Sequence, residues 1–152
     1  MKLIKILFIM AAAIIINSCS QFIITPVNFA WPLESVFDVD STGTVEEQRY
    51  AFTFNAVPLL EQESDSTQVI SKTKLRIIRG EKGFYYITAE NFKHVYIFSP
   101  GEGELLLKKK ILLSEEGIHA PAFNQRAPFV QLLYDEERSV FLNSEGIVEE
   151  TE

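Results

Sequence analysis

The sequence predicts an all-β fold, a single antiparallel β-sandwich or barrel of about eight strands that follows an N-terminal signal peptide. Three observations lead to this prediction. Short apolar runs recur along the chain, and apolar and polar side chains alternate within several of them. Clusters of Gly, Pro, Asp and Ser separate the runs, and only Glu90–Lys93 has a briefly helical pattern. We therefore expect one all-β domain over residues 33–148.

The first two strands are expected at Glu34–Val39 and Val45–Ala56, paired as a hairpin across a turn in which Gly43 can adopt a positive φ. Aromatic residues alternate with small or polar ones in the second strand, which predicts one buried face. The residues expected to be buried are Tyr50, Phe52, Phe54, Leu75 and Ile77. The remaining strands are expected at Thr67–Arg79, Phe84–Ala89, His94–Ser99, Glu104–Leu113, Phe129–Tyr134 and Arg138–Leu142.

The first eighteen residues have the pattern of a secretory leader. Lys2 and Lys5 lie in a short region without acidic residues, and Ile6–Ile16 is an unbroken apolar run. A transmembrane helix needs about 20 apolar residues to cross the hydrocarbon layer, so this run is too short to be a stable span. We expect residues 1–18 to be a signal peptide that is removed on export.

The end of the leader, Ile16-Asn17-Ser18-Cys19, resembles the lipobox of bacterial lipoproteins. The resemblance implies that the Cys19 thiol receives a diacylglyceryl group and that cleavage follows just before it. Asn17 departs from the small residue usual at its position. Cys19 is the only cysteine of the chain, so an exported protein cannot use it for an internal disulfide. We expect it to anchor the protein to a membrane through lipid.

An address within the envelope is also predicted. Inner-membrane retention in enteric bacteria resembles an aspartate directly after the lipidated cysteine, whereas Ser20 occupies that place here. No acidic cluster of the kind that resembles a surface-export signal follows it. We therefore expect the outer membrane, with the domain on the periplasmic face.

The charge of the chain excludes one class of partner. Its formal net charge is −7, and loss of the two leader lysines makes it more acidic. Nucleic-acid binding needs a basic footprint, so we expect no nucleic-acid partner. Membrane association should depend on the lipid alone.

Two segments do not fit a simple series of strands. Residues 19–32 should form a tether, yet they are rich in large apolar residues, unlike a flexible linker. They are expected to pack as a strap against the domain or a partner. Ser114–Pro128 is expected to be a long functional loop without regular structure. The acidic residues 149–152 are expected to be a frayed tail.

Four residues are candidates for contacts with a partner. The loop residues Phe123, Asn124 and Arg126 combine an aromatic ring, an amide and a guanidinium, which are usual interface groups. Trp31 offers an aromatic platform for a sugar or a peptide, or alternatively a plug beneath the sandwich, and the plug is the favoured interpretation. Lys108–Lys110 suggests either an anionic partner or protection of an edge strand from aggregation, and protection is the favoured interpretation.

Metal binding has one weak candidate. Asp38, Asp40 and Thr42 have the spacing that begins a calcium loop, followed by a glycine. The position that should supply a bidentate glutamate is Arg49, so a plain turn is favoured. We expect no metal and no cofactor.

Catalysis has no recognisable set of residues. No G-x-S-x-G nucleophile elbow is present, and His94 and His119 are the only histidines. The leading hypothesis is a lipid-anchored, non-enzymatic envelope subunit that binds or scaffolds a protein partner. The alternatives are a lipoprotein that binds a small ligand or glycan, and a hydrolase whose residues assemble from distant positions.

Overall fold

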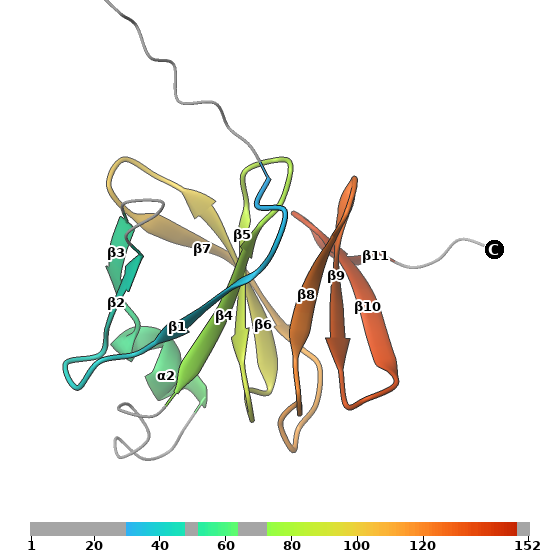
Figure 1. Cartoon of the computed structure of the whole chain (residues 1–152), viewed down its shortest axis with the longest axis horizontal. Helices are drawn as coiled ribbons and strands as arrows, with labels where there is room; N and C mark the ends of the chain where they lie inside the picture. The colour runs from blue at the N-terminus through green and yellow to red at the C-terminus, as the bar shows by residue number, and fades with distance from the viewer. Residues whose placement is uncertain (1–29, 48–51, 64–72, 149–152) are drawn as a thin grey trace, which may run out of the picture.

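The computed structural model describes residues 30–47, 52–63 and 73–148 (Figure 1). The expected signal peptide, Cys19, most of the tether and the acidic tail lie outside the described residues. Within the described residues, no helix is long and apolar enough to cross a bilayer.

The described chain is built almost entirely of strands, in agreement with the predicted all-β class. A five-stranded antiparallel sheet has the order β1-β4-β5-β6-β7. Its strands are β1 (Ser35–Asp38), β4 (Lys74–Arg79), β5 (Tyr85–Ala89), β6 (His94–Pro100) and β7 (Leu105–Leu112). A four-stranded antiparallel sheet has the order β11-β10-β9-β8. Its strands are β8 (Ala122–Arg126), β9 (Phe129–Tyr134), β10 (Arg138–Asn143) and β11 (Gly146–Val148).

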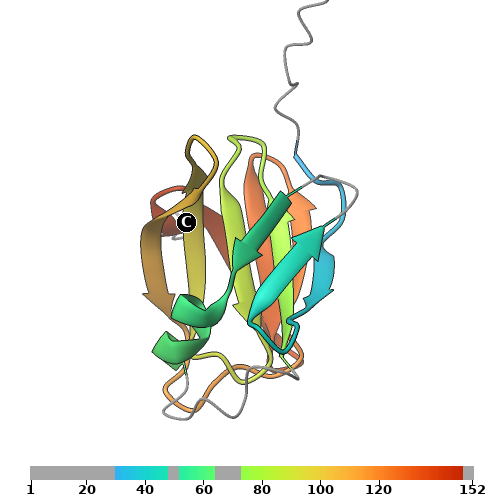
Figure 2. The same ribbon diagram turned by 90° about the vertical axis from the view of Figure 1, so that its left-hand side faces the viewer.

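The four-stranded sheet lies on one side of the five-stranded sheet, and a smaller unit covers the opposite face. The hairpin of β2 (Thr44–Glu47) and β3 (Phe52–Asn55) continues into helix α2 (Val57–Glu63). Figure 2 shows this hairpin and helix in front of the sheet, and Figure 1 shows β8–β11 on the opposite side. The described strands therefore form layers of three separate sheets rather than one closed barrel.

Alternation along the strands divides the buried side chains between the two faces of the central sheet. Tyr86 lies beside Gly80 and Val130 and faces the four-stranded sheet, whereas its neighbour Tyr85 contacts Trp31 on the other face. Leu75 and Ile77 are fully buried, which confirms that part of the predicted core. Phe54 is only half-buried against it. Tyr50 and the side chain of Phe52 lie outside the described residues.

The expected hairpin between the first two strands is wrong. Strand β1 pairs with β4, and the single strand expected at Val45–Ala56 is divided into β2 and β3, which pair with each other. Strand β3 ends at Asn55, and helix α2 begins directly after Ala56. Asn55 Oδ1 accepts a hydrogen bond of 2.9 Å from Val57 N at the start of this helix, and Pro58 fits its first turn.

The prediction of a long unstructured loop at Ser114–Pro128 is also wrong, because β8 occupies its second half. The first half is held by backbone hydrogen bonds, with Ile118 N donating to Phe92 O at 2.8 Å and Asn91 N donating to Ile118 O at 2.9 Å. The Glu90–Lys93 segment is a turn with Asn91 at a positive φ of 65° rather than a helix. These contacts bind the segment to the sheet.

Candidate binding groove

A groove of about 770 Å³ separates the hairpin and helix layer from the five-stranded sheet. One wall comes from β3 and α2 and includes Phe54, Asn55, Leu59 and Gln62. The floor and the other wall come from β5, β6 and the β6–β7 hairpin, with Tyr85, Tyr96, Phe98, Glu104, Leu105 and Leu107. Elements far apart in the sequence thus enclose one mainly apolar space.

The floor of the groove is aromatic because of the two-residue repeat of β6. Tyr96 and Phe98 project from the same face, and their rings stack with centroids 6.5 Å apart. Tyr85 lies opposite Phe98 in the strand pairing. Beside Tyr85, the ring of Trp31 makes an edge contact at 5.7 Å, and the Arg79 guanidinium lies 5.6 Å from the Tyr85 ring centre. The aromatic floor is therefore supported from the side by these two residues.

Glu63 fixes helix α2 over this floor. Its side chain is only 3% exposed, and its carboxylate accepts hydrogen bonds from His94 Nδ1 at 2.7 Å and from Lys93 N at 2.6 Å. The Tyr96 hydroxyl donates a third hydrogen bond to the same carboxylate. Burial, with the hydrogen bond to Glu63 and its negative charge, raises the pKa of Tyr96. The helix is thus held at its last residue by three donors, two from β6 and one from the residue just before it.

The outer rim of the groove is formed by β7, the last strand of the five-stranded sheet. Leu107 lines the groove and is 47% exposed, and Lys110 places its ammonium 5.6 Å from the centre of the Tyr96 ring. The sequence interpretation of Lys108–Lys110 as part of an edge strand is confirmed by this position. Its protective role stays a prediction.

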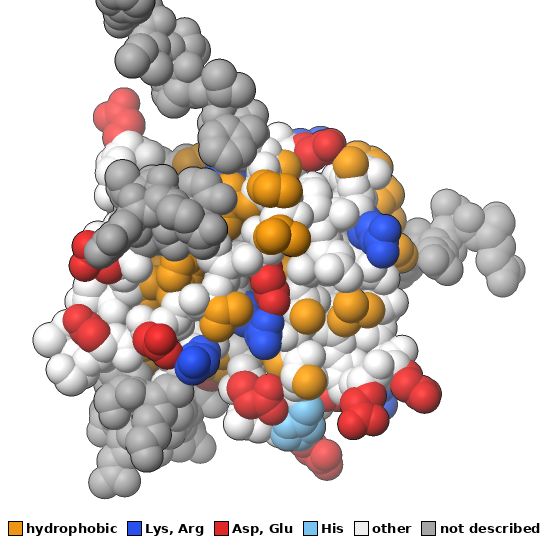
Figure 3. Space-filling view, viewed as in Figure 1, with side chains coloured by type: hydrophobic (Ala, Val, Ile, Leu, Met, Phe, Trp, Pro, Cys, Tyr) orange, Lys and Arg blue, Asp and Glu red, His pale blue; other side chains and the backbone are white. Residues whose placement is uncertain are grey.

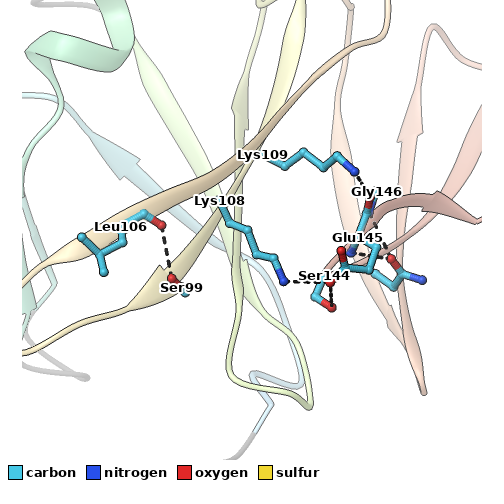
Figure 4. Close-up of polar contacts among 8 residues, drawn as sticks. Ser99, Leu106, Lys108, Lys109, Ser144, Glu145 and Gly146 are labelled. Carbon is cyan, nitrogen blue, oxygen red and sulfur yellow. Dashed lines mark hydrogen bonds and ion pairs between the residues drawn. The ribbon is translucent and has the colours of Figure 1, made fainter.

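The far half of β7 is held against the four-stranded sheet, as Figure 4 shows. Lys108 Nζ lies 2.7 Å from Glu145 Oε1, and Lys109 donates a hydrogen bond to the Glu145 carbonyl oxygen. Both contacts come from the turn between β10 and β11. They leave Lys110 as the lysine of this run that faces the groove side.

The sequence-predicted partner residues do not form one site. Trp31 is 2% exposed and Phe123 is 3% exposed, so both rings belong to the core. The expectation that Phe123 presents its ring to a partner is wrong, and Trp31 is a buried plug rather than an exposed platform. Phe123 is buried because β8 pairs with β9 and turns alternate side chains inward. Asn124 pairs through its backbone with Leu33, and exposed Arg126 donates to Gln131 on the outer sheet face at 3.4 Å.

Figure 3 shows the face that carries β1 and β8, where apolar side chains are scattered between charged ones. Leu33 and Val36 are exposed, and Glu34 forms an ion pair with Arg76. Apolar surface here is interrupted, whereas in the groove it is enclosed on two sides. The groove is therefore the better candidate site.

The weak calcium candidate is a turn. Asp40 Oδ1 accepts hydrogen bonds from Thr42 N and Thr44 N, each at 2.8 Å, and from the Thr42 hydroxyl at 2.7 Å. The hydroxyl of Thr42, followed by the backbone donors, lowers the pKa of Asp40. Asp38 instead lies 3.6 Å from Lys74 Nζ. No group of three metal-ligating side chains occurs in the described part of the chain.

The histidines take part in pairs rather than in a catalytic set. His94 contacts Glu63, and exposed His119 lies 3.1 Å from Glu90 Oε1. Among the described hydrogen bonds, no serine or threonine hydroxyl contacts the imidazole of His94 or His119. The Glu63 carboxylate is occupied by the contacts that fix α2.

The groove itself was missed by the sequence interpretation. The in-phase spacing of His94, Tyr96 and Phe98 signalled a shared face, but the sequence did not show that α2 would lie across it. No family model, curated protein or solved structure matches this chain.

Proposed function

We propose that this protein is a lipid-anchored, non-enzymatic binding protein of the bacterial cell envelope. Lipid on Cys19 holds it in the outer membrane, facing the periplasm, and the groove takes up part of a protein partner. The observation that carries the proposal is the pair of half-buried rings of Tyr85 and Phe98, which lie beside the buried Tyr96 and the exposed Leu107. Partly solvated aromatic and leucine surface of this kind gains free energy when a partner covers it.

A binding role accounts for the chemistry of the groove better than hydrolysis does. The carboxylate that is hydrogen-bonded to the floor residue Tyr96, Glu63, is saturated by three donors, and a saturated carboxylate is a poor general base. Tyr96 has a raised pKa, so its hydroxyl stays protonated at neutral pH and serves as a hydrogen-bond donor. The groups around the groove therefore hold its shape.

A second function, binding of a small molecule or glycan, is favoured by one observation. The volume of about 770 Å³ lies within the range of small-ligand sites, and the amides of Asn55 and Gln62 line the wall opposite the aromatic floor. Aromatic rings with nearby amides suit a sugar or another flat ligand with polar edges.

Photo-crosslinking in living cells separates the two functions. A photoreactive amino acid at Leu107 of the full chain should give a discrete protein adduct, because this side chain lines the groove. The matched control is Lys82, an exposed position in the turn between β4 and β5. Absence of an adduct at Leu107, together with a small molecule retained in native mass spectra, would establish the second function instead. Absence of both would remove the groove as a site.

A further inference from the structure

Strand β7 is the longest strand described and lies at the edge of its sheet. It has eight residues and pairs, among the described strands, with β6 alone. Edge strands carry a row of backbone donors and acceptors that another chain can use. The question is which of its residues offer those groups, and which side chains accompany them.

The strand pairing identifies the outward-facing backbone groups. Gly101 N donates to Glu104 O and Leu113 N donates to Lys93 O, both at 2.8 Å, so Glu104 and Leu113 direct backbone groups toward β6. In an antiparallel ladder such residues alternate with residues whose groups point away. The register shift between Ile97 and Phe98 leaves Lys108 without a partner residue. Counting from both ends, the residues with outward backbone groups are Leu105, Leu107, Lys110 and Leu112.

These residues also share the groove-side face of the sheet. Leu107 lies opposite Phe98, Lys110 opposite Tyr96, and Leu112 opposite His94 in the register. Side chains opposite each other in a pair lie on the same face. A strand added to β7 would therefore place every second side chain beside the groove.

The charge of β7 decides whether a second copy of this chain or an acidic peptide strand is the better partner for its edge. A second copy of the chain pairing edge to edge in antiparallel register sets lysines against lysines, and like charges opposite each other destabilise a strand pair. Lys108 and Lys109 already contact Glu145, whereas no carboxylate among the described residues lies within ion-pair distance of Lys110. A strand with an acidic residue opposite Lys110 would neutralise its ammonium, and apolar residues opposite the leucines would cover their side chains.

We propose that the partner segment is an extended peptide that adds to the free edge of β7 as an antiparallel strand. Its groove-side residues are apolar opposite Leu105, Leu107 and Leu112, and acidic opposite Lys110. This inference rests on the proposed protein-binding function and specifies the chemistry of the segment. Backbone hydrogen bonds supply affinity, and the groove together with Lys110 supplies selectivity.

The test uses the full chain in detergent and synthetic fluorescent peptides. One peptide alternates threonine with groove-side residues in the order valine, glutamate, valine, valine, and a second replaces the glutamate by lysine. Fluorescence anisotropy should show about fivefold tighter binding of the glutamate peptide. The Lys110→Glu variant should reverse this preference, and the control Lys82→Glu should not. Equal binding of both peptides to the unaltered chain, or no binding, would overturn the proposal.

A backbone variant tests strand addition separately from charge. Leu107→Pro removes an outward N–H without breaking the pairing with β6, and it should weaken peptide binding about tenfold. Leu107→Ala keeps the N–H and is the matched control. Thermal melting establishes that each variant folds, and the charge swap at Lys110 decides the matter if Leu107→Pro unfolds. Hydrogen exchange should slow at the amides of Leu105, Leu107 and Lys110 when the peptide binds. Slowing at the edge of β1 or β8 instead would contradict the assignment.

The outcomes distinguish this inference from the proposed function. A cellular adduct at Leu107 with no peptide binding to β7 would leave the binding function standing and defeat strand addition. Peptide binding without a cellular adduct would defeat the proposed function, while the edge of β7 would still accept a strand of the stated chemistry.

Discussion

A single buried carboxylate connects two layers of this molecule. Glu63 ends helix α2, yet all three of its described donors come from residues 93–96 on and beside β6. A buried carboxylate that accepts several hydrogen bonds stabilises the arrangement only while every donor keeps its partner. The position of the helix over the groove therefore depends on this residue more than on any exposed residue of α2.

Replacing Glu63 by glutamine should destabilise the protein. The amide turns one acceptor oxygen into a donor that faces donors, which costs about 1 to 3 kcal/mol for a buried group left unsatisfied. Urea unfolding measures the change, and Glu61→Gln is the control because Glu61 is exposed on the same helix. If both variants unfold at the same urea concentration, the Glu63 contacts do not hold the helix.

Tyr86 predicts how stability responds to alkaline pH. Burial raises the pKa of Tyr86 from the ordinary value of 10 to about 12. The folded protein thus keeps this proton where the unfolded chain loses it, so the contribution is complete below pH 10 and is lost as the pH rises toward 12. Burial of Tyr96 acts in the same direction.

Unfolding free energies measured between pH 9 and about 12 should fall more steeply for the unaltered chain than for Tyr86→Phe. The variant lacks the phenol whose ionisation opposes folding. Parallel curves for the two proteins would mean that Tyr86 ionises equally easily in both states.

At the scale of elements, alternation and turn residues predicted the strands that pair with their neighbours in sequence. The prediction for β9, Phe129–Tyr134, matches the structure. Those for β5, β6 and β10 differ from it by one residue at one end, and that for β7 differs by one residue at each end. Each has strong alternation or an apolar run bounded by a turn. Pairing of β1 with β4 was not predictable, because a residue pattern fixes a strand but not a distant partner.

Weak local signals explain the elements that were missed. Strand β8 is short and lies between Pro121 and Pro128, so its single inward aromatic residue, Phe123, suggested an exposed contact in a loop. Helix α2 has only seven residues and continues a strand pattern. In both cases tertiary packing, rather than local preference, decides the conformation.

The turn before β8 provides a prediction at this scale. Gly117 has a φ of +92°, and a Cβ there would lie 2.7 Å from the carbonyl oxygen of Asn91. Gly103 has a similar φ of +75° with no atom within 4 Å of its Cβ position. Both positions disfavour alanine for backbone reasons, but only Gly117 adds a clash with main chain that cannot move aside.

Gly117→Ala should therefore cost more than Gly103→Ala, by about 1 to 3 kcal/mol. Chemical denaturation of the two variants beside the unaltered chain measures the difference. Equal losses would indicate that the 114–121 segment shifts freely, and that its contacts with Asn91 and Phe92 do not hold it.

For the whole molecule, the groove illustrates what one sequence cannot provide. Its lining comes from β3, α2, β5, β6 and β7, and each segment taken alone has the composition of ordinary core or edge. The shared face of Tyr96 and Phe98 on β6 was predictable from their two-residue spacing. The layer that turns that face into a groove depends on Glu63 contacting residues about 30 positions later.

The N-terminal part links the domain to the proposed anchor. The ring of Trp31 makes an edge contact with Tyr85, and the backbone N–H of Trp31 donates to Arg79 O at 2.8 Å, so the chain is fixed to the sheet at this residue. About twelve residues connect it to Cys19, and an extended chain of that length spans at most about 40 Å. A lipid on Cys19 would hold Trp31, and the sheet fixed to it, within that distance of the membrane surface.

The last prediction follows from this arrangement. Cells fed labelled palmitate should label the unaltered protein but not Cys19→Ala, and Ser20→Ala should keep the label. Replacing residues 1–18 of the Cys19→Ala chain by a leader that ordinary signal peptidase removes should release the protein from the membrane fraction. Its melting temperature should stay unchanged, because the backbone contact of Trp31 with Arg79 still fixes the chain to the sheet. Retention of label and membrane association by the Cys19→Ala chain would refute the anchor. Release together with a large loss of stability would show that Cys19 or its lipid contributes to the stability of the fold.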